Sequence, residues 1–179
     1  MATDLIAEMD RDFEGTFDAT QDWVLDPDER VRATACLACA QKPDASDIVR
    51  VRRLLSRLEL FMADASPVVE EVVGPQVIAS LLVQFPTVAY PWLKEWAVAD
   101  EETVRANIAR SLGGEPARLF PMESVDVLEL LAVDMRPKVR TAVIDAFRQI
   151  VAARPEMRGY VLSHFSGLIS RRTEPEEPL

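Results

Sequence analysis

The sequence predicts an all-α fold, and three observations support this prediction. Helix-favouring residues such as Ala, Leu, Glu and Arg dominate, and only six of the 179 residues are glycine. Apolar residues recur at the three- and four-residue intervals of an amphipathic helix, as in Val51, Leu54, Leu55 and Leu58. A seven-residue segment also recurs four times along the chain. Such a recurrence is typical of proteins that stack one helical unit on the next.

The recurring segment has valine at its sixth position in all four copies. These valines, Val31, Val69, Val104 and Val139, are spaced 38, 35 and 35 residues apart. The copies are Asp26–Arg32, Asp64–Glu70, Ala99–Arg105 and Asp134–Arg140. A large apolar residue stands three positions before each copy: Trp23, Phe61, Trp96 and Leu131. We refer to the copies as the four aligned segments.

Each aligned segment is expected to join two helices. An apolar stripe of helical period precedes it, and Pro27, Pro67 or Pro137 falls in the first turn of the second helix, where proline is tolerated. After Val31, Val104 and Val139, apolar or small residues follow at four, seven and eight positions, as core-facing residues of a helix do. We therefore expect helical hairpins at about residues 15–42, 44–85, 87–114 and 118–153.

The pattern Asp-x-x-x-x-Val-Arg, which opens a second helix and has an early proline, resembles the HEAT repeat over roughly residues 15–153. The resemblance implies a right-handed α-solenoid of four hairpins with N- and C-terminal capping helices, in one domain of residues 1–171. It also implies a ladder of charge-assisted hydrogen bonds between adjacent hairpins. The ladder residues would be Asp26, Arg32, Asp64, Arg105, Asp134 and Arg140.

Two residues depart from the ladder pattern. Glu70 stands where arginine is expected, and Ala99 stands where aspartate is expected, with Asp100 beside it. We expect the ladder to be interrupted in the middle, and we expect the substitution Glu70→Arg to do no harm. Gly74-Pro75 lies inside the second helix of the hairpin that contains Glu70. Proline at this place should kink or restart the helix. Gly113 and Gly114 should end the next second helix as left-handed caps.

The two ends of the chain are expected to be one-sided helices. Leu5, Ile6, Met9 and Phe13 give the N-terminal helix its apolar face, and a cap helix is expected at residues 156–170. Residues 172–179 are charged and rich in proline, which predicts a disordered acidic tail. No secretory signal or membrane span is evident, so we expect a cytoplasmic protein and no membrane partner.

Acidic residues are concentrated at the N-terminal end. The net charge is −10, and residues 1–30 alone carry −8, with ten acids against two arginines. This balance disfavours nucleic acid as a partner and favours a cationic protein, with Asp10, Asp12, Asp18 and Asp22 as candidate contacts. Arg50, Arg53 and Arg57 form a basic stripe. Two ordinary roles, a solvated outer face or salt links to the acidic first 30 residues, are favoured for this stripe over a site for an anion or an acidic partner.

The sequence shows no catalytic constellation, metal site or cofactor motif. Cys36 and Cys39 have no further cysteine to complete a zinc site, and they occupy small core columns of the repeat. His164 has no nearby cysteine or serine to work with. Trp92 with Tyr90 would suit a binding surface if exposed, although such spacing is more often packing.

These observations favour a non-enzymatic scaffold or adaptor for protein–protein interaction. The partner would bind either the acidic end or the inner surface that the second helices form. Residues there that the core does not claim are Thr34, Leu37, Gln41, Glu71, Asn107, Arg110, Asp145 and Gln149. Three alternatives remain: an acidic inhibitor or immunity-type protein that masks a basic target, an accessory protein similar to HEAT-repeat phycobilin lyases, and a HEAT-like DNA glycosylase. The net charge of −10 disfavours the last.

Overall fold

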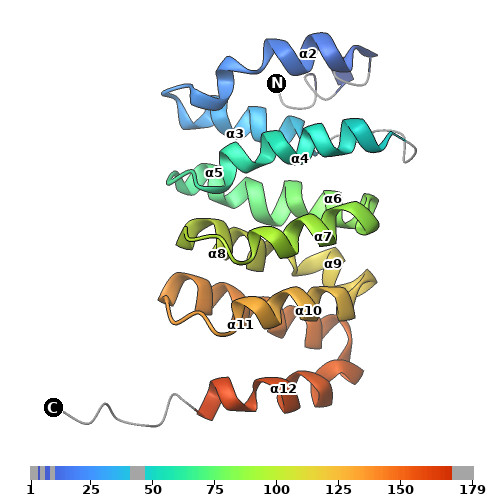
Figure 1. Ribbon diagram of the computed structural model, residues 1–179, viewed down its shortest axis with the longest axis vertical. Coiled ribbons are helices and arrows are strands. Elements are labelled where there is room, and N and C mark those ends of the chain that lie inside the picture. The colour runs from blue at the N-terminus through green and yellow to red at the C-terminus, as the bar shows by residue number, and fades with distance from the viewer. Residues whose placement is uncertain (1–3, 5–6, 9–10, 41–46, 171–179) are drawn as a thin grey trace, which may run out of the picture.

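A computed structural model describes residues 4, 7–8, 11–40 and 47–170, without the side chains of 164 and 166–170. Every regular element in this part of the chain is a helix, as predicted. Figure 1 shows these helices stacked along the long axis of the molecule, with the two termini at opposite ends. None of the described helices has the length and apolar character needed to cross a bilayer.

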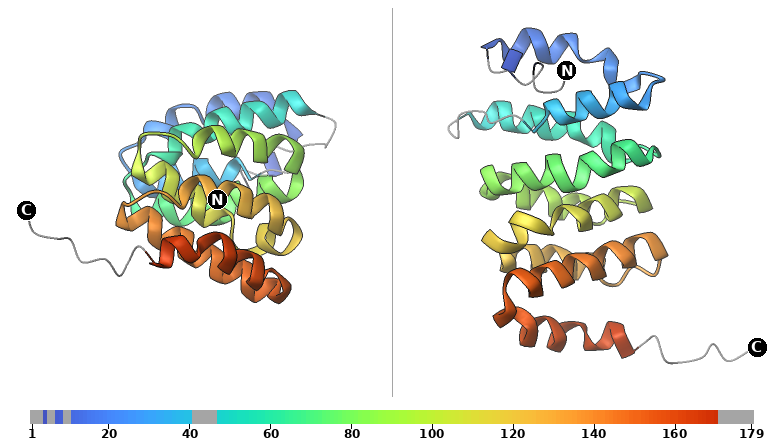
Figure 2. Two further views of the ribbon diagram at one scale, coloured as in Figure 1. Left: turned by 60° about the horizontal axis from the view of Figure 1, so that its bottom comes forward. Right: turned by 180° about the vertical axis from the view of Figure 1, so that it is seen from behind.

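The helices alternate between two layers, which the opposite views of Figures 1 and 2 show from both sides. One layer holds α2 (Phe13–Ala19), α4 (Ile48–Met62), α7 (Pro86–Trp96) and α10 (Pro121–Leu131). The other holds α3 (Glu29–Ala38), α5 (Pro67–Val72), α6 (Ala79–Gln84), α8 (Glu102–Ser111) and α11 (Pro137–Ala153). The remaining elements are η1 (Asp22–Leu25), η2 (Val73–Ile78), α9 (Gly114–Leu119), η3 (Pro155–Met157) and α12 (Arg158–Ser170).

Each layer is built by contacts between elements that are near neighbours in the repeat. In the second layer α11 packs on α8, α8 packs on η2, and α5 packs on α3. In the first layer α7 lies between α4 and α10. Apolar side chains between the layers, such as Leu58, Phe61, Ile108 and Leu128, have no exposed surface. Burial of each such side chain stabilises the fold by about 1.5–3 kcal/mol. Because these residues come from α4, α8 and α10, the core extends along the stack.

Polar caps and prolines set where the helices begin. Asp47 accepts from the backbone N–H of Arg50 at the start of α4, and Ser66 accepts from Val68 at the start of α5. Proline occupies the first turn of α5, α7, α10 and α11. Its missing N–H costs nothing there because the first N–H groups of a helix have no intrahelical acceptor.

The helix around Pro75 does not restart, although a restart is one of the two outcomes that the sequence predicts there. It widens into the π-helical segment η2, Val73–Ile78, and then continues as α6. Widened turns of this kind absorb an irregular hydrogen-bond pattern. Gly74 is buried in η2 against α8, where an added Cβ would lie 2.6 Å from the carbonyl oxygen of Asn107. The absence of a side chain therefore sets how closely η2 and α8 approach.

Only one of the two predicted glycine caps is left-handed. Gly114 has φ of 59°, whereas Gly113 has φ of −82° and extended backbone. The short helix α9 follows directly, in a stretch that the sequence pattern leaves between two units. It turns the chain from the second layer back to the first.

The ends of the stack are covered by amphipathic helices in the described part of the chain. Phe13 and Phe17 of α2 are buried at one end, and Val161 and Phe165 of α12 are buried at the other. Leu5, Ile6, Met9 and the tail of residues 172–179 lie outside the described residues.

Candidate functional site

Arg32 of α3 binds Asp64, the first residue of the next aligned segment. Its Nε and Nη2 atoms donate to the two carboxylate oxygens at 2.6 and 3.1 Å, and its Nη1 atom donates to the main-chain carbonyl of Asp26 at 2.8 Å. Burial alone would raise the pKa of Asp64, but hydrogen bonds from Arg32 and from the Ser66 N–H outweigh it and lower that pKa. This pair joins the first two units.

Arg105 of α8 makes the corresponding link between the last two units. Its Nε atom donates to Asp134 at 2.6 Å, and its Nη1 atom donates to the carbonyl oxygen of Ala99. The contact with residue 99 uses only the main chain, as the contact of Arg32 with Asp26 does. Ala99 can therefore replace the expected aspartate without loss of the hydrogen bond between its main-chain carbonyl and Arg105.

Glu70 replaces the middle link with a different connection. Its Oε2 atom accepts from Nη1 of Arg110 in α8 at 2.9 Å, and its Oε1 atom accepts from Nζ of Lys138 in α11. One largely buried carboxylate thus connects three units through the second layer. These contacts give reason to expect that Glu70→Arg is harmful, against the expectation from the sequence, because a third cation would meet Arg110 and Lys138.

The two outermost ladder positions lack this type of partner. The Asp26 carboxylate accepts from the backbone N–H of Asp28, but no cation lies within ion-pair distance of it among the described residues. Arg140 likewise has no carboxylate within that distance in the same part of the chain. Both residues are only partly exposed.

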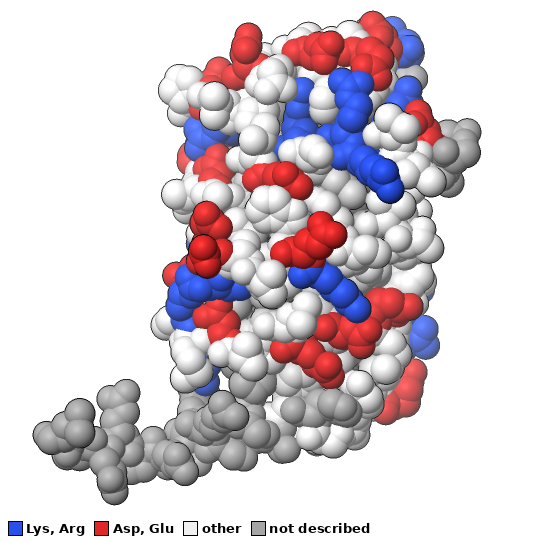
Figure 3. All heavy atoms as spheres, in the orientation of Figure 1, with Lys and Arg blue, Asp and Glu red and all other residues white. Residues whose placement is uncertain are grey.

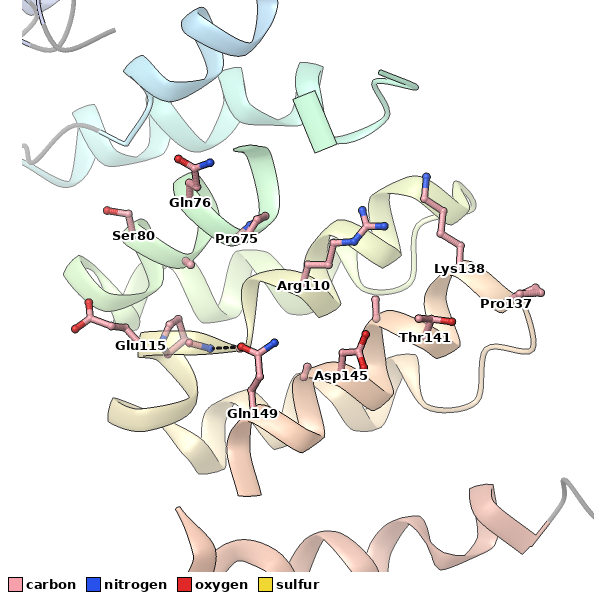
Figure 4. A pocket seen from close by; sticks show the side chains of 16 residues that line it. Pro75, Gln76, Ser80, Arg110, Glu115, Pro137, Lys138, Thr141, Asp145 and Gln149 are labelled. Carbon is pink, nitrogen blue, oxygen red and sulfur yellow. Dashed lines mark hydrogen bonds between the residues drawn. The ribbon is translucent and has the colours of Figure 1, made fainter. Parts of the chain in front are cut away.

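A cavity of about 880 Å³ opens on the second layer, between α6, α9 and α11. Figure 4 shows its side chains around one hollow: Gln76 and Ser80 come from η2 and α6, Arg110 from α8, and Thr141, Asp145 and Gln149 from α11. The hairpins at about residues 44–85, 87–114 and 118–153 all contribute lining residues to it. This cavity is the candidate site.

Backbone geometry at α9 shapes one wall of the cavity. The side chain of Gln149 accepts from the Gly114 N–H at 2.8 Å (Figure 4) and lies against Gly113, where a Cβ atom would collide with its amide. Two glycines thus let α11 and the start of α9 approach each other. On the opposite wall, η2 places Pro75 and Gln76 at the rim.

The charged groups of the cavity are largely neutralised by neighbours. Arg110 is held by Glu70, Asp145 pairs with Arg148 at 3.0 Å, and Glu115 pairs with Arg118 at 3.1 Å. Ser80 and Thr141 add uncharged hydrogen-bonding groups. This arrangement suits hydrogen bonding to the amide groups of a peptide better than recognition of a highly charged ligand.

The structure brings together only some of the residues predicted for the inner surface. Arg110, Asp145 and Gln149 line the cavity. Asn107 was expected to be free, but it is fully buried: its Nδ2 atom donates to the carbonyl of Met62 and its Oδ1 atom accepts from Arg110. It is a structural polar residue.

The other predicted surface residues do not contribute to this cavity. Thr34 bonds the carbonyl of Arg30, Leu37 packs partly against the core, and Glu71 is exposed on α5. Gln41 lies outside the described residues. Sequence reasoning missed Lys138 and Thr141 as lining residues. Their signal was their place in the first turns of α11, beside the valine of the aligned segment.

The acidic residues of the N-terminal end lie largely in solvent. Figure 3 shows acidic side chains grouped at this end, with basic side chains beside them. Asp12 caps α2 through the Gly15 N–H, Asp18 lies 3.6 Å from Arg53, and Asp22 is exposed in η1. Asp10 lies outside the described residues.

The arginine stripe of α4 is used for contacts with the N-terminal segment. Arg53 pairs with Glu14, and the buried Arg57 donates to the carbonyl of Phe17 at 2.5 Å and to Gln21 at 2.6 Å. Arg50 lies 4.4 Å from the ring centre of Phe13. These contacts favour the interpretation of the stripe as a salt link to the first 30 residues.

The remaining sequence candidates are packed in the interior. Cys36 and Cys39 are fully buried, and burial raises the pKa of Cys39 to about 12 and that of Cys36 above its ordinary value. Tyr90 is buried and shares a hydrogen bond with Ser124, so it forms no exposed aromatic surface with Trp92. Within the described residues, no group of three or more His, Cys, Asp or Glu could hold a metal ion.

No protein-family model, curated protein or solved structure matches this chain. The contacts above therefore provide the basis for a functional proposal.

Proposed function

We propose that this chain is a HEAT-like, right-handed α-solenoid that serves as a scaffold or adaptor for a partner protein. The four hairpins and their capping helices would form one domain of residues 1–171. The partner would bind the cavity on the inner, second-helix surface. The observation that carries this proposal is the 880 Å³ cavity lined by side chains from three successive units.

Repeated contacts support the solenoid interpretation. Arg32–Asp64 and Arg105–Asp134 occupy equivalent positions in different pairs of units and have the same 2.6 Å Nε–carboxylate distance. Each arginine also reaches the carbonyl at the start of its own segment. Each contact joins the last residue of one aligned segment to the first residue of the next, which is what stacking of similar units produces.

The chemistry of the cavity favours a peptide segment of a protein over a nucleic acid. Phosphate groups would need cations that are free to neutralise them, but Arg110 and Lys138 are both bound to Glu70. Gln76, Ser80, Thr141 and Gln149 can donate and accept hydrogen bonds, as a peptide backbone requires. A large surface with mixed polar and apolar groups is also how solenoids hold extended partners.

The acidic end gives this scaffold a second property. A field concentrated at one end should steer a cationic partner and raise the association rate more than it slows dissociation. Association should slow as salt rises past physiological strength, where the Debye length is about 8 Å. Replacing Asp10, Asp12, Asp18 and Asp22 with Asn should slow it at low salt.

An affinity capture with matched variants tests the cavity. The wild-type chain is compared with Thr141→Arg, which fills the cavity from α11, and with Ser56→Arg, which adds the same side chain to an exposed position of α4. Proteins retained from source-cell lysate are identified by mass spectrometry. We expect a specific partner to be retained by the wild type and Ser56→Arg and lost from Thr141→Arg.

A partner that all three proteins retain equally would contradict binding in the cavity. In that case, loss of retention in the four-Asn variant of the acidic end would place the interaction there instead. Circular dichroism of each variant checks that the helical fold is kept.

A further inference from the structure

A second hollow lies at the C-terminal end of the stack, between α11 and α12. It encloses about 580 Å³, and Val143, Phe147, Val161 and Phe165 form its apolar floor. Ile144 and Leu162 at its edges are 42% and 47% exposed. The hollow is therefore an open apolar groove, which we call the terminal groove.

Three arginines, Arg140, Arg148 and Arg158, line the terminal groove. Arg148 pairs with Asp145, but no carboxylate of the described residues lies within ion-pair distance of Arg140 or Arg158. Arg140 occupies the same column as Arg32 and Arg105, each of which binds an aspartate of the next unit. The groove is thus cationic at its edge, and Arg140 lacks the carboxylate that its equivalents have.

Glu129 of α10 also lacks the partners that its equivalent residue in the second hairpin has. Its Oε1 atom is buried and has no hydrogen-bond partner. Glu59 stands at the equivalent position of the second unit, in Leu58-Glu59-Leu60, and its Oε1 atom accepts from the indole N–H groups of Trp92 and Trp96 in the next unit. A buried acceptor without a donor is costly. The last unit therefore carries two polar groups suited to a following unit.

The opposite end of the chain is complementary. Trp23 and Asp26 occupy the columns of Trp96 and Asp134, which are bound by Glu59 and Arg105 of the hairpin before them. Trp23 is only partly buried, and no cation of the described residues pairs with Asp26. Residues 1–30 carry −8, whereas residues 136–170 hold six basic and two acidic residues, a net +4.

We propose that the terminal groove binds the acidic N-terminal end of a second copy of this chain, so that molecules associate head to tail. The apolar floor would take apolar surface from the first unit of the next molecule, and Arg140 and Arg158 would meet its carboxylates. The cationic partner expected from the acidic end is then the other end of the same protein. Because the two surfaces differ, each molecule can bind one neighbour at each end.

Sedimentation velocity at rising protein concentration tests this proposal. We expect the wild type to form species larger than dimers, and we expect raised ionic strength to dissociate them. Arg140→Glu with Arg158→Glu blocks the groove and should leave a monomer. Asp18→Lys with Asp22→Lys reverses charge at exposed positions of the other end and should also leave a monomer.

An equal mixture of the two variants provides the decisive measurement. The acidic end of the groove variant can bind the intact groove of the other variant. The resulting dimer has no functional end left, so it cannot bind a third molecule. We therefore expect the mixture to form dimers and nothing larger, although each variant alone is monomeric. A control with the same change in net charge, Arg52→Glu with Arg118→Glu at exposed positions, should associate like the wild type.

A wild type that stays monomeric at every concentration overturns the proposal, and this is the result expected if the groove binds residues 171–179 or another acidic protein. Failure of the mixture to dimerise also overturns it. The outcome is independent of the cavity on the second layer, because Thr141→Arg leaves both ends unchanged and should associate as the wild type does.

Discussion

The Nε atom of Arg105 lies 2.6 Å from Oδ2 of Asp134, and only 9% and 10% of the two side chains are exposed. The Nη2 atom of Arg105 is already buried without a hydrogen-bond partner. Asp134→Ala would leave the guanidinium without its carboxylate. We expect this change to lower the free energy of unfolding by about 1–3 kcal/mol, measured by urea denaturation.

Asp126→Ala is the control for this prediction. Asp126 forms an exposed pair with Lys94 at 3.4 Å, and removal of such a pair should change stability by less than about 1 kcal/mol. If Asp134→Ala unfolds at the same urea concentration as this control, the buried pair does not stabilise the stack.

Glu70 should be one of the residues most sensitive to charge reversal. Glu70→Arg removes two ion pairs and places three cations together, so we expect a loss of about 2–4 kcal/mol in the free energy of unfolding. Combining it with Arg110→Glu restores one pair of opposite charges and should recover part of the loss. Thermal unfolding of the single and double variants measures this coupling. A single variant as stable as the wild type would refute the central role of this carboxylate.

The Arg32–Asp64 pair should make the free energy of unfolding depend on pH in the acidic range. The folded structure lowers the pKa of Asp64 below its ordinary value of 3.8, so the unfolded chain takes up the proton first as pH falls. The stability that this carboxylate contributes is present above pH 3.8 and is lost as pH falls through its folded pKa. Asp64→Asn should therefore be less stable than wild type at neutral pH, and the two should converge in acid.

Urea titrations from neutral to acidic pH measure that convergence. A difference between wild type and Asp64→Asn that stays constant over this range would mean that the ionised carboxylate is not the source of the stabilisation.

The two cysteines should be unreactive in the folded protein. Both side chains are fully buried, and burial raises the pKa of Cys39 to about 12, so almost no thiolate is present at pH 8. We expect a chromophoric thiol reagent to modify both cysteines only after denaturation. Rapid labelling of the native protein would show that α3 opens readily, which would contradict a structural role for this pair.

The sequence was most informative at positions where the same residue type recurs in every unit for the same structural reason. The valine column, the turn prolines and the large apolar column predict helices because each depends on local period and backbone chemistry. Asp64 and Asp134 were also recognisable, because each begins an aligned segment and its partner arginine ends the preceding one. An all-α fold follows from such signals without knowledge of any distant contact.

The candidate site was harder to predict because it depends on contacts between units that break the pattern. Glu70 looked like a missing arginine, yet it binds cations 40 and 68 residues away. Asn107 looked like a surface residue because of its polarity, but the close approach of η2 and α8 buries it. Glycine in a helix does not by itself indicate what lies against it.

The close approach of η2 and α8 leaves no room for a side chain at residue 74. At Gly74 an added Cβ would lie 2.6 Å from the Asn107 carbonyl oxygen, a backbone atom of α8 that cannot rotate away. Gly74→Ala should therefore destabilise the protein by about 1–3 kcal/mol, because the cost of overpacking exceeds the roughly 0.5–1 kcal/mol that alanine gains over glycine within a helix.

Gly159→Ala in α12 separates these two effects, since nothing lies within 4 Å of its added Cβ. Only the conformational gain applies there, so we expect the melting temperature to stay equal or rise, while that of Gly74→Ala falls. The shift of α8 in Gly74→Ala should also disturb Asn107, which holds both the Met62 carbonyl and Arg110 at the edge of the cavity. Faster amide hydrogen exchange in α8 than in the Gly159→Ala protein would report this disturbance. Equal stability and exchange in the two variants would mean that η2 can move away from α8 at little cost.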